Sequence, residues 1–184
     1  MFPEILSHVI TRLEQARKNG LLQAYALIGG FAVSAWGVSR ATQDIDLAVA
    51  LGTSAPQALA THLGATYEAG DADDPLQGAF HLTIENNGQA IPVQLIVLRS
   101  KWANVAFTEV QTLNIIGCVV PVVNWHALVL LKLYAGGPVD LQDARSVAAV
   151  RNPNAAERET LVVQADALGL GQEIRTLFDS LRLS

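Results

Sequence analysis

The stretch that decides the fold reads Leu27-Ile28-Gly29-Gly30-Phe31 and then Arg40-Ala41-Thr42-Gln43-Asp44-Ile45-Asp46-Leu47. It contains a glycine pair followed by two carboxylates that are two residues apart. Because side chains alternate across a β-strand, Asp44 and Asp46 are expected on one face, with the intervening side chain in the core. Two carboxylates held side by side repel each other unless a cation lies between them. Hard divalent cations such as Mg²⁺ take oxygen ligands of this kind, together with substrate phosphates.

The glycine pair supplies the complementary half of such a site. Gly29 and Gly30 follow a short apolar run, residues 24–28, and precede a helical pattern. Since glycine has no Cβ, backbone N–H groups at this turn can approach a phosphate at the start of the helix. The combination indicates chemistry on a nucleoside triphosphate. A simpler interpretation treats the glycines as a place of close helix packing and the two aspartates as a solvated strand end.

Length and composition limit the class of protein. A chain of 184 residues is expected to form one domain, and 51% hydrophobic residues with a mean hydropathy of +0.30 argue against disorder. No apolar run is long enough to span a bilayer, the N-terminus lacks signal-peptide features, and Cys118 is the single cysteine. We therefore expect a cytoplasmic protein without a membrane partner. The net charge of −5 argues against a general nucleic-acid binder.

Periodicity along the chain predicts strands first and helices last. An apolar hairpin, residues 80–85 and 91–98, is joined by the turn signal Asn86-Asn87-Gly88. The other expected elements are helices at 3–18, 31–38, 56–63, 125–134, 140–150, 155–168 and 172–181, strands at 24–28 and 43–50, two short strands within 111–123, and a loop at 67–77. This order predicts an α+β fold, a mixed sheet flanked by helices with a C-terminal helical cap. We expect a core at residues 1–123 and a helical region at 124–184.

The order and spacing of these motifs resemble the nucleotidyltransferase fold superfamily, in which a glycine turn precedes an Asp-x-Asp strand. The string is most similar to the small bacterial branch around the AbiEii-type toxins, where the segment reads Arg-x-Thr-x-Asp-hydrophobic-Asp-hydrophobic. Residues 40–47 match it at each position. The resemblance implies Mg²⁺-dependent transfer of a nucleoside monophosphate from an NTP to a protein or RNA acceptor, with Mn²⁺ as a second candidate metal. It also implies a place in a toxin–antitoxin or phage-defence pair with a cognate partner.

The resemblance also assigns roles to individual residues. Asp44 and Asp46 become the catalytic carboxylates that hold the metal, and Gly29 and Gly30 the turn that binds the nucleotide phosphates. Two further nucleotide-binding candidates lie between these motifs: Arg40 and Thr42 either orient a phosphate or brace the aspartate strand.

A block near the C-terminus strengthens the resemblance. Lys132 precedes a Gly-Gly-Pro turn, and Asp140 and Asp143 open the next expected helix. The family places such a lysine beside the triphosphate, although the usual turn carries an arginine that is absent here. Lys132 is either a nucleotide-binding residue or a helix lysine whose stem lies along an apolar face. For the two aspartates we favour structural roles, with Asp140 as an N-cap.

One position departs from the family pattern. The family has a third carboxylate on a later strand, whereas this chain reads Val93-Gln94-Leu95-Ile96. The amide oxygen of Gln94 can serve as a third metal ligand, but it cannot offset charge or act as a general base. Three interpretations stay open. The chain uses a one-metal or weakened mechanism, Glu85 on the partner strand substitutes, or the protein is a catalytically reduced module that binds a nucleotide or a partner without transfer.

Overall fold

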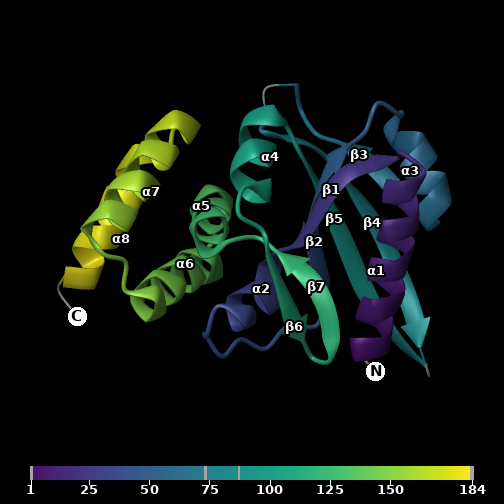
Figure 1. Cartoon of the computed structure of the whole chain (residues 1–184), viewed down its shortest axis with the longest axis horizontal. Helices are drawn as coiled ribbons and strands as arrows, with labels where there is room; N and C mark the ends of the chain where they lie inside the picture. Colours follow the sequence, from purple (N-terminus) through teal and green to yellow (C-terminus); the bar gives the residue numbers. More distant parts are fainter. Residues whose placement is uncertain (1, 73, 87, 183–184) are drawn as a thin grey trace.

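A mixed seven-stranded sheet with the strand order β3-β4-β5-β2-β1-β7-β6 forms the centre of the molecule (Figure 1). The computed structural model describes residues 2–72, 74–86 and 88–182. The strands are β1 (Leu22–Leu27), β2 (Ile45–Leu51), β3 (Thr66–Ala69), β4 (Leu76–Asn86), β5 (Gln89–Leu98), β6 (Gln111–Ile115) and β7 (Cys118–Val122). The pairs β2–β5 and β1–β7 are parallel, and the other neighbouring pairs are antiparallel.

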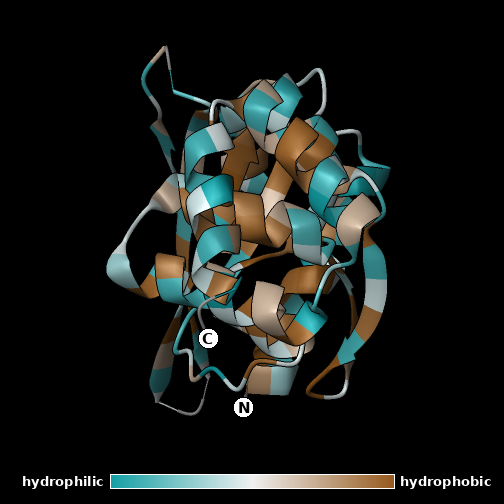
Figure 2. Ribbon diagram, turned by 90° about the vertical axis from the view of Figure 1, so that its left-hand side faces the viewer, coloured by the Kyte–Doolittle hydropathy of each residue, from teal (hydrophilic) through white to brown (hydrophobic). Residues whose placement is uncertain are grey.

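Helices pack on both faces of this sheet. In chain order they are α1 (Phe2–Lys18), α2 (Gly29–Ala35), α3 (Pro56–Leu63), α4 (Ser100–Phe107), α5 (Trp125–Ala135), α6 (Pro138–Arg151), α7 (Ala155–Leu168) and α8 (Gly171–Arg182). The hydroxyl of Tyr25 in β1 donates to Glu14 of α1 at 2.7 Å, which ties α1 to its face. The last four helices extend to the left of the sheet in Figure 1. Figure 2 shows helices that carry hydrophobic and hydrophilic residues on different sides, as expected when one side faces a core.

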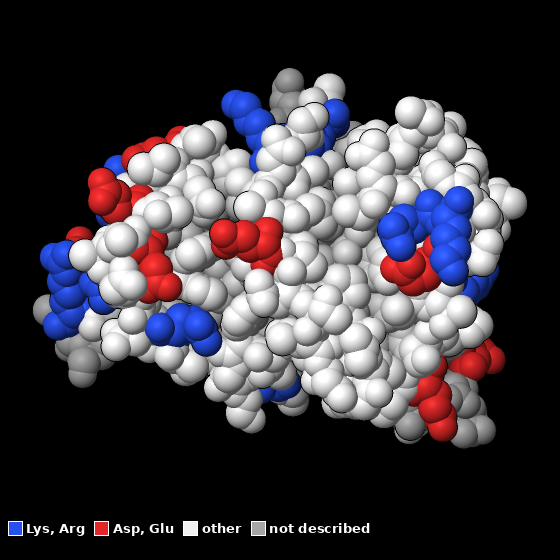
Figure 3. All heavy atoms as spheres, in the orientation of Figure 1, with Lys and Arg blue, Asp and Glu red and all other residues white. Residues whose placement is uncertain are grey.

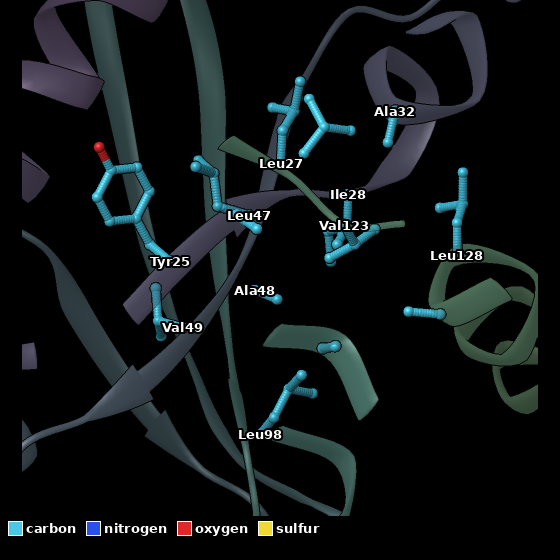
Figure 4. Packing of buried hydrophobic residues seen from close by; sticks show 14 of the residues in the cluster. Tyr25, Leu27, Ile28, Ala32, Leu47, Ala48, Val49, Leu98, Val123 and Leu128 are labelled. Carbon is cyan, nitrogen blue, oxygen red and sulfur yellow. The ribbon is translucent and has the colours of Figure 1, made fainter. Parts of the chain in front are cut away.

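The central strands form the core because they are apolar on both faces. In β2, Ile45, Leu47, Ala48 and Val49 are all fully buried, and the alternate residues of β5 are buried beside them. Figure 4 shows part of this packing, from Tyr25 and Val49 to Leu128 on α5. A strand pair that is buried on both faces reads as a nearly continuous apolar run, which is typical of a parallel pair. Asp46 is therefore an exception to this apolar pattern, because it is a half-buried carboxylate within the run.

The predicted fold class, a mixed sheet flanked by helices with C-terminal helices, is confirmed. The hairpin is also confirmed, since Asn86 of β4 pairs with Gln89 of β5, although Asn87 of the predicted turn lies outside the described residues. The pair of short strands around Gly117 is present as β6 and β7. Helix 56–63 has the limits predicted for it. None of the described helices is both long and apolar enough to cross a membrane.

Local structure differs from the prediction in two places. The loop predicted at 67–77 is shorter than expected, residues 70–72 and 74–75 among those described, because β3 occupies Thr66–Ala69 and β4 already begins at Leu76. Periodicity missed β3 because this edge strand buries little of its surface and is held by backbone pairing with β4. Helix α4 was not anticipated either. It has no side-chain cap at Arg99 and is instead anchored by the buried side chains of Trp102 and Ala106.

Several helices and strands begin or end a few residues away from their predicted limits. Helix α2 begins at Gly29 and ends at Ala35, earlier than the expected 31–38, and β2 begins at Ile45, so that Asp44 lies just before the strand. Helix α6 begins with Pro138 after Gly137 as its N-cap, so Asp140 is in the first turn and is not the N-cap. The division into regions 1–123 and 124–184 stays a prediction, because buried residues of both belong to one hydrophobic core.

Candidate active site

The site lies where β1 ends and β2 begins. Gly29 and Gly30 open α2 immediately after β1, and the Ile28 N–H donates to the backbone oxygen of Asp46 at 2.9 Å. Asp46 in turn pairs in register with Gln94 on the neighbouring parallel strand β5. Directly paired residues point to the same face of a sheet, so the side chain of Gln94 lies beside that of Asp46. The structure thus places Gln94 where the resemblance expects a third carboxylate.

Both glycines are required by the close approach of site side chains. Gly29 has a φ of +64°, and a Cβ added there would lie 2.7 Å from Cβ of Asp46 and would overlap its carboxylate oxygen Oδ2. A Cβ on Gly30 would lie 2.7 Å from Cβ of Thr42. The absence of a side chain at this turn therefore lets the Asp46 carboxylate lie directly against the start of α2. The glycines have a packing role, and phosphate binding by their N–H groups stays a prediction.

The two carboxylates are held in different ways. The hydroxyl of Thr42 donates to Oδ1 of Asp44 at 2.5 Å, so Thr42 braces the exposed carboxylate that precedes β2. Burial, and then the charge of Asp44, raise the pKa of Asp46 to about 6, against the opposing effect of Lys132. Ionised Asp46 is therefore costly in this setting. A cation between the two carboxylates would remove that cost.

The donor set fits a hard divalent cation. Two carboxylates and the amide oxygen of Gln94 are all oxygen ligands, the kind that Mg²⁺ and Mn²⁺ bind. Within residues 2–72, 74–86 and 88–182, no group of three or more His, Cys, Asp or Glu side chains is placed to hold a metal. Any cation at this site would therefore rely on Asp44 and Asp46, with Gln94 as a neutral third donor.

Lys132 is held by two carboxylates of the next helix. Its Nζ lies 2.7 Å from Oδ1 of Asp140 and 3.0 Å from Oδ2 of Asp143, and its side chain is only 13% exposed. Burial by itself would lower the pKa of Lys132, but the hydrogen bonds with Asp140 and Asp143 outweigh it and raise that pKa. Lys132 is consequently a charged, fixed group, and not a lysine whose ammonium extends into solvent.

Arg40 belongs to the same ion-pair network. Its Nε lies 3.4 Å from Oδ1 of Asp143, a residue that is 4% exposed. Its Nη1 also donates to the backbone oxygen of Ala41. Arg40 thus connects the segment before β2 to α6, which favours the bracing role over direct phosphate contact. The structural role expected for Asp143 agrees with this position between Arg40 and Lys132.

All the predicted site residues line one cavity of about 530 Å³ between the sheet and α5–α6. They are Gly29, Gly30, Arg40, Thr42, Asp44, Asp46, Gln94 and Lys132. The same cavity is also lined by Leu76, Ile96, Leu128, Leu131, Tyr134 and Val139, which are mainly apolar. A second hollow of about 520 Å³ lies beside it, and both hollows are lined by Asp44, Asp46 and Gln94.

Tyr134 and His81 are among the lining residues that sequence reasoning missed. Tyr134, which lines the first cavity, is fixed by a 3.0 Å hydrogen bond to Asp74 and by ring contact with Trp102. His81, in the second hollow, pairs directly with Gln94 across the hairpin. The turn signal could have revealed His81, because a hairpin turn sets the register of every pair behind it. Tyr134 had no comparable signal, since its contacts join segments far apart in the sequence.

Glu85 does not replace the third carboxylate. It pairs with Ala90, four pairs along the hairpin from the His81–Gln94 pair, and it lines neither hollow. At roughly 3.3 Å per residue, that offset is about 13 Å. The interpretation in which Glu85 substitutes is therefore wrong.

The chain is similar to solved structures over almost its whole length. No protein-family model matches the chain, and no curated protein matches it. Among solved structures, it is similar to the solution structure of the antibiotic-resistance factor ANT(2'')-Ia, with 19% identity and a TM-score of 0.44 over 97% of this chain and 92% of that one. It is also similar to the crystal structure of ANT(2'')-Ia in complex with adenylyl-2''-tobramycin, with 18% identity and a TM-score of 0.41 over 97% of each chain.

Proposed function

We propose that the protein is a Mg²⁺-dependent nucleotidyltransferase that moves a nucleoside monophosphate from an NTP to a protein or RNA acceptor. The supporting observation is that residues from separate segments line one cavity, in which Asp46 and Gln94 are direct neighbours on parallel strands. Nucleotidyl transfer requires positioning and charge compensation more than covalent chemistry from the protein. The residues that would position the nucleotide and those that would compensate its charge line the same cavity.

Asp44 and Asp46 would hold the metal, with the amide oxygen of Gln94 as a third donor. A bound Mg²⁺ supplies charge neutralisation for the phosphates and for the carboxylate pair. Mn²⁺ has the same preference for oxygen ligands and is the second candidate. Thr42 contributes by fixing Asp44 through its 2.5 Å hydrogen bond.

The rest of the cavity suits a nucleotide. The N–H groups of Gly29 and Gly30 lie at the start of α2, beside Asp46, where they could donate to phosphate oxygens. An ammonium has three donors, and Asp140 and Asp143 engage two of those on Lys132, which leaves one for the triphosphate. The apolar lining residues, together with Tyr134 held by its hydrogen bond to Asp74, would contact the nucleoside.

A catalytically reduced nucleotide- or partner-binding module is the second candidate. Two observations favour it: Gln94 is neutral where a carboxylate is expected, and Lys132 is already paired with two carboxylates. Isothermal titration with NTP and Mg²⁺ distinguishes the two candidates. Tight binding without turnover, followed by turnover in Gln94→Asp, would support the module. Absence of nucleotide binding would remove the enzyme and the nucleotide-binding form of the module, and would leave the partner-binding form.

The direct test is label transfer from NTPs labelled at the α-phosphate, with Mg²⁺ and with bulk transfer RNA or soluble bacterial protein as acceptor. We expect Asp46→Asn to abolish transfer and to leave the circular dichroism spectrum unchanged. The fold should persist because the site already disfavours a charge at this position. Glu159→Gln, an exposed carboxylate on α7, is the matched control. Transfer by Asp46→Asn at the rate of the unchanged protein would rule out the proposed metal site.

Membership of the AbiEii-type branch and a role in a toxin–antitoxin or phage-defence pair are finer proposals, supported by the residue pattern at 40–47. They predict that expression of the chain slows bacterial growth and that Asp46→Asn relieves this effect. Equal growth with both chains would contradict a toxin role that depends on the site.

A further inference from the structure

A groove of about 830 Å³, the β6 groove, lies between α2 and the edge strand β6. Its lining is mainly apolar and includes Phe31 of α2, Leu113 of β6 and Ile116 of the turn that follows. Arg40 and Thr42 line both this groove and the first cavity. The groove therefore adjoins the residues that brace the carboxylates. Figure 1 shows β6 at the edge of the sheet beside α2.

The backbone of β6 is open on one side. Among the described residues, β6 pairs with β7 alone, so its other edge keeps N–H and C=O groups without a strand partner. An extended polypeptide can add to such an edge through main-chain hydrogen bonds, with its side chains in neighbouring pockets. RNA has no amide backbone and cannot pair in this way. The edge therefore favours a polypeptide in the groove.

Ile116 is exposed at a position that is unfavourable for an isoleucine. It has a φ of +46° and is 44% exposed. A left-handed φ is rare for a β-branched residue, and a two-residue hairpin turn prefers asparagine or glycine there. Val119, another exposed apolar residue, pairs with Asn114, which lines the groove, so both point to the same face. Because such backbone strain clusters at functional sites, Ile116 indicates a contact with another molecule.

The charges around the carboxylates do not suit an RNA. All 12 Lys and Arg residues belong to the described part of the chain, and only Arg40 and Lys132 line the first cavity, the second hollow or the β6 groove. Both are ion-paired with Asp143. Proteins that bind RNA rely on such cations to neutralise its phosphates. The electrostatics thus favour an acceptor without a phosphate backbone.

We propose that the acceptor is a polypeptide that binds in extended form along β6, with an apolar side chain in the β6 groove. This inference rests on the proposed nucleotidyl transfer and narrows its acceptor from protein or RNA to protein. In the step, a side-chain hydroxyl of the polypeptide forms a bond to the α-phosphorus of the NTP, and the bond from that phosphorus to the bridging oxygen breaks. The electron pair of the broken bond leaves with pyrophosphate, and the hydroxyl proton passes to water.

A competition experiment tests the class of acceptor. The full chain is given an NTP labelled at the α-phosphate, Mg²⁺, and equal masses of bulk transfer RNA and soluble bacterial protein in one reaction. We expect label that protease releases and ribonuclease does not. An equal or higher level of label in the RNA would overturn the polypeptide acceptor while nucleotidyl transfer stands. Absence of label from both would instead overturn the proposed function itself.

Ile116→Asn tests the groove. Asparagine tolerates a positive φ, so the fold should persist. Loss of the apolar side chain should slow protein labelling about tenfold at low acceptor concentration. The affinity for a nonhydrolysable NTP with Mg²⁺, measured by titration calorimetry, should not change. The matched control is Val163→Asn, an exposed β-branched residue of α7 outside the groove.

Leu113→Gln is a second variant within the groove, on the strand itself. It should slow protein labelling in the same direction as Ile116→Asn, again with unchanged NTP affinity. Protein labelling at the original rate in both variants would overturn the β6 groove as the acceptor site. An equal loss of labelling and of NTP affinity would also overturn it, because the groove would then support the nucleotide cavity and not the acceptor.

Discussion

At the scale of single residues, the site requires two positions that carry no side chain, Gly29 and Gly30. Gly29 allows the Asp46 carboxylate to lie against the start of α2, and Gly30 does the same for Thr42. Motif spacing identified both glycines and left two interpretations open, phosphate contact and close helix packing. Their packing against site side chains became visible only once β2 was placed beside the turn.

Gly29→Ala is expected to destabilise the protein for two separable reasons. A left-handed φ costs a non-glycine residue about 1–2 kcal/mol, and overpacking against Asp46 should add about 1–3 kcal/mol. Gly20→Ala is the matched control, because Gly20 has a similar φ of +73° and no heavy atom within 4 Å of an added Cβ. Urea denaturation of both variants measures the difference. An equal loss of unfolding free energy at the two positions would show that Asp46 moves aside without cost.

At the scale of elements, a buried ion-pair network connects α5, α6 and the segment before β2. Asp143 of α6 contacts both Lys132 and Arg40 while being almost fully buried. The sequence suggested a structural role for Asp143, but it could not show that Arg40 is one of its partners. That contact depends on how α6 packs against the sheet, which local spacing does not encode.

Asp143→Asn is expected to lower the unfolding free energy by about 1–3 kcal/mol, because Arg40 loses the charge of its buried carboxylate partner while Lys132 keeps its ion pair with Asp140. Asp166→Asn supplies the contrast: its ion pair with Arg175 is exposed, at 49% and 54%. An exposed pair contributes about 0–1 kcal/mol. Chemical denaturation of the two variants measures both values. Similar small losses would mean that the Asp143 network has little energetic weight.

At the scale of the whole molecule, the sheet and the C-terminal helices share one core. Residues of α5 such as Leu128 and Leu130 are fully buried in the same cluster as Leu47 and Val49 of β2. Charged side chains of both signs are interspersed over the face of the molecule in Figure 3, which shows no large patch of one sign. The site therefore depends on local placement of charge and on the packing of the helices against the sheet.

Truncation tests the predicted division of the chain. A fragment of residues 1–123 lacks α5 and should not unfold cooperatively, because the apolar face that α5 covers becomes exposed. A fragment of residues 1–153 keeps α5 and α6 and should unfold cooperatively at a lower urea concentration than the full chain. Circular dichroism during urea titration measures both. Cooperative unfolding of the shorter fragment would establish residues 1–123 as an independent domain.

The sequence by itself determined what depends on spacing along the chain. It placed the glycine turn, the carboxylates at Asp44 and Asp46, and Gln94 on a later strand, because alternation and turn chemistry are local properties. Only the tertiary structure decided which strands are neighbours and what each side chain touches. Edge strand β3, the position of His81 beside Gln94 and the pairing of Arg40 with Asp143 all depend on the burial of whole faces. Which faces are buried depends on packing between segments that are far apart in the sequence, so no short stretch of sequence predicts it.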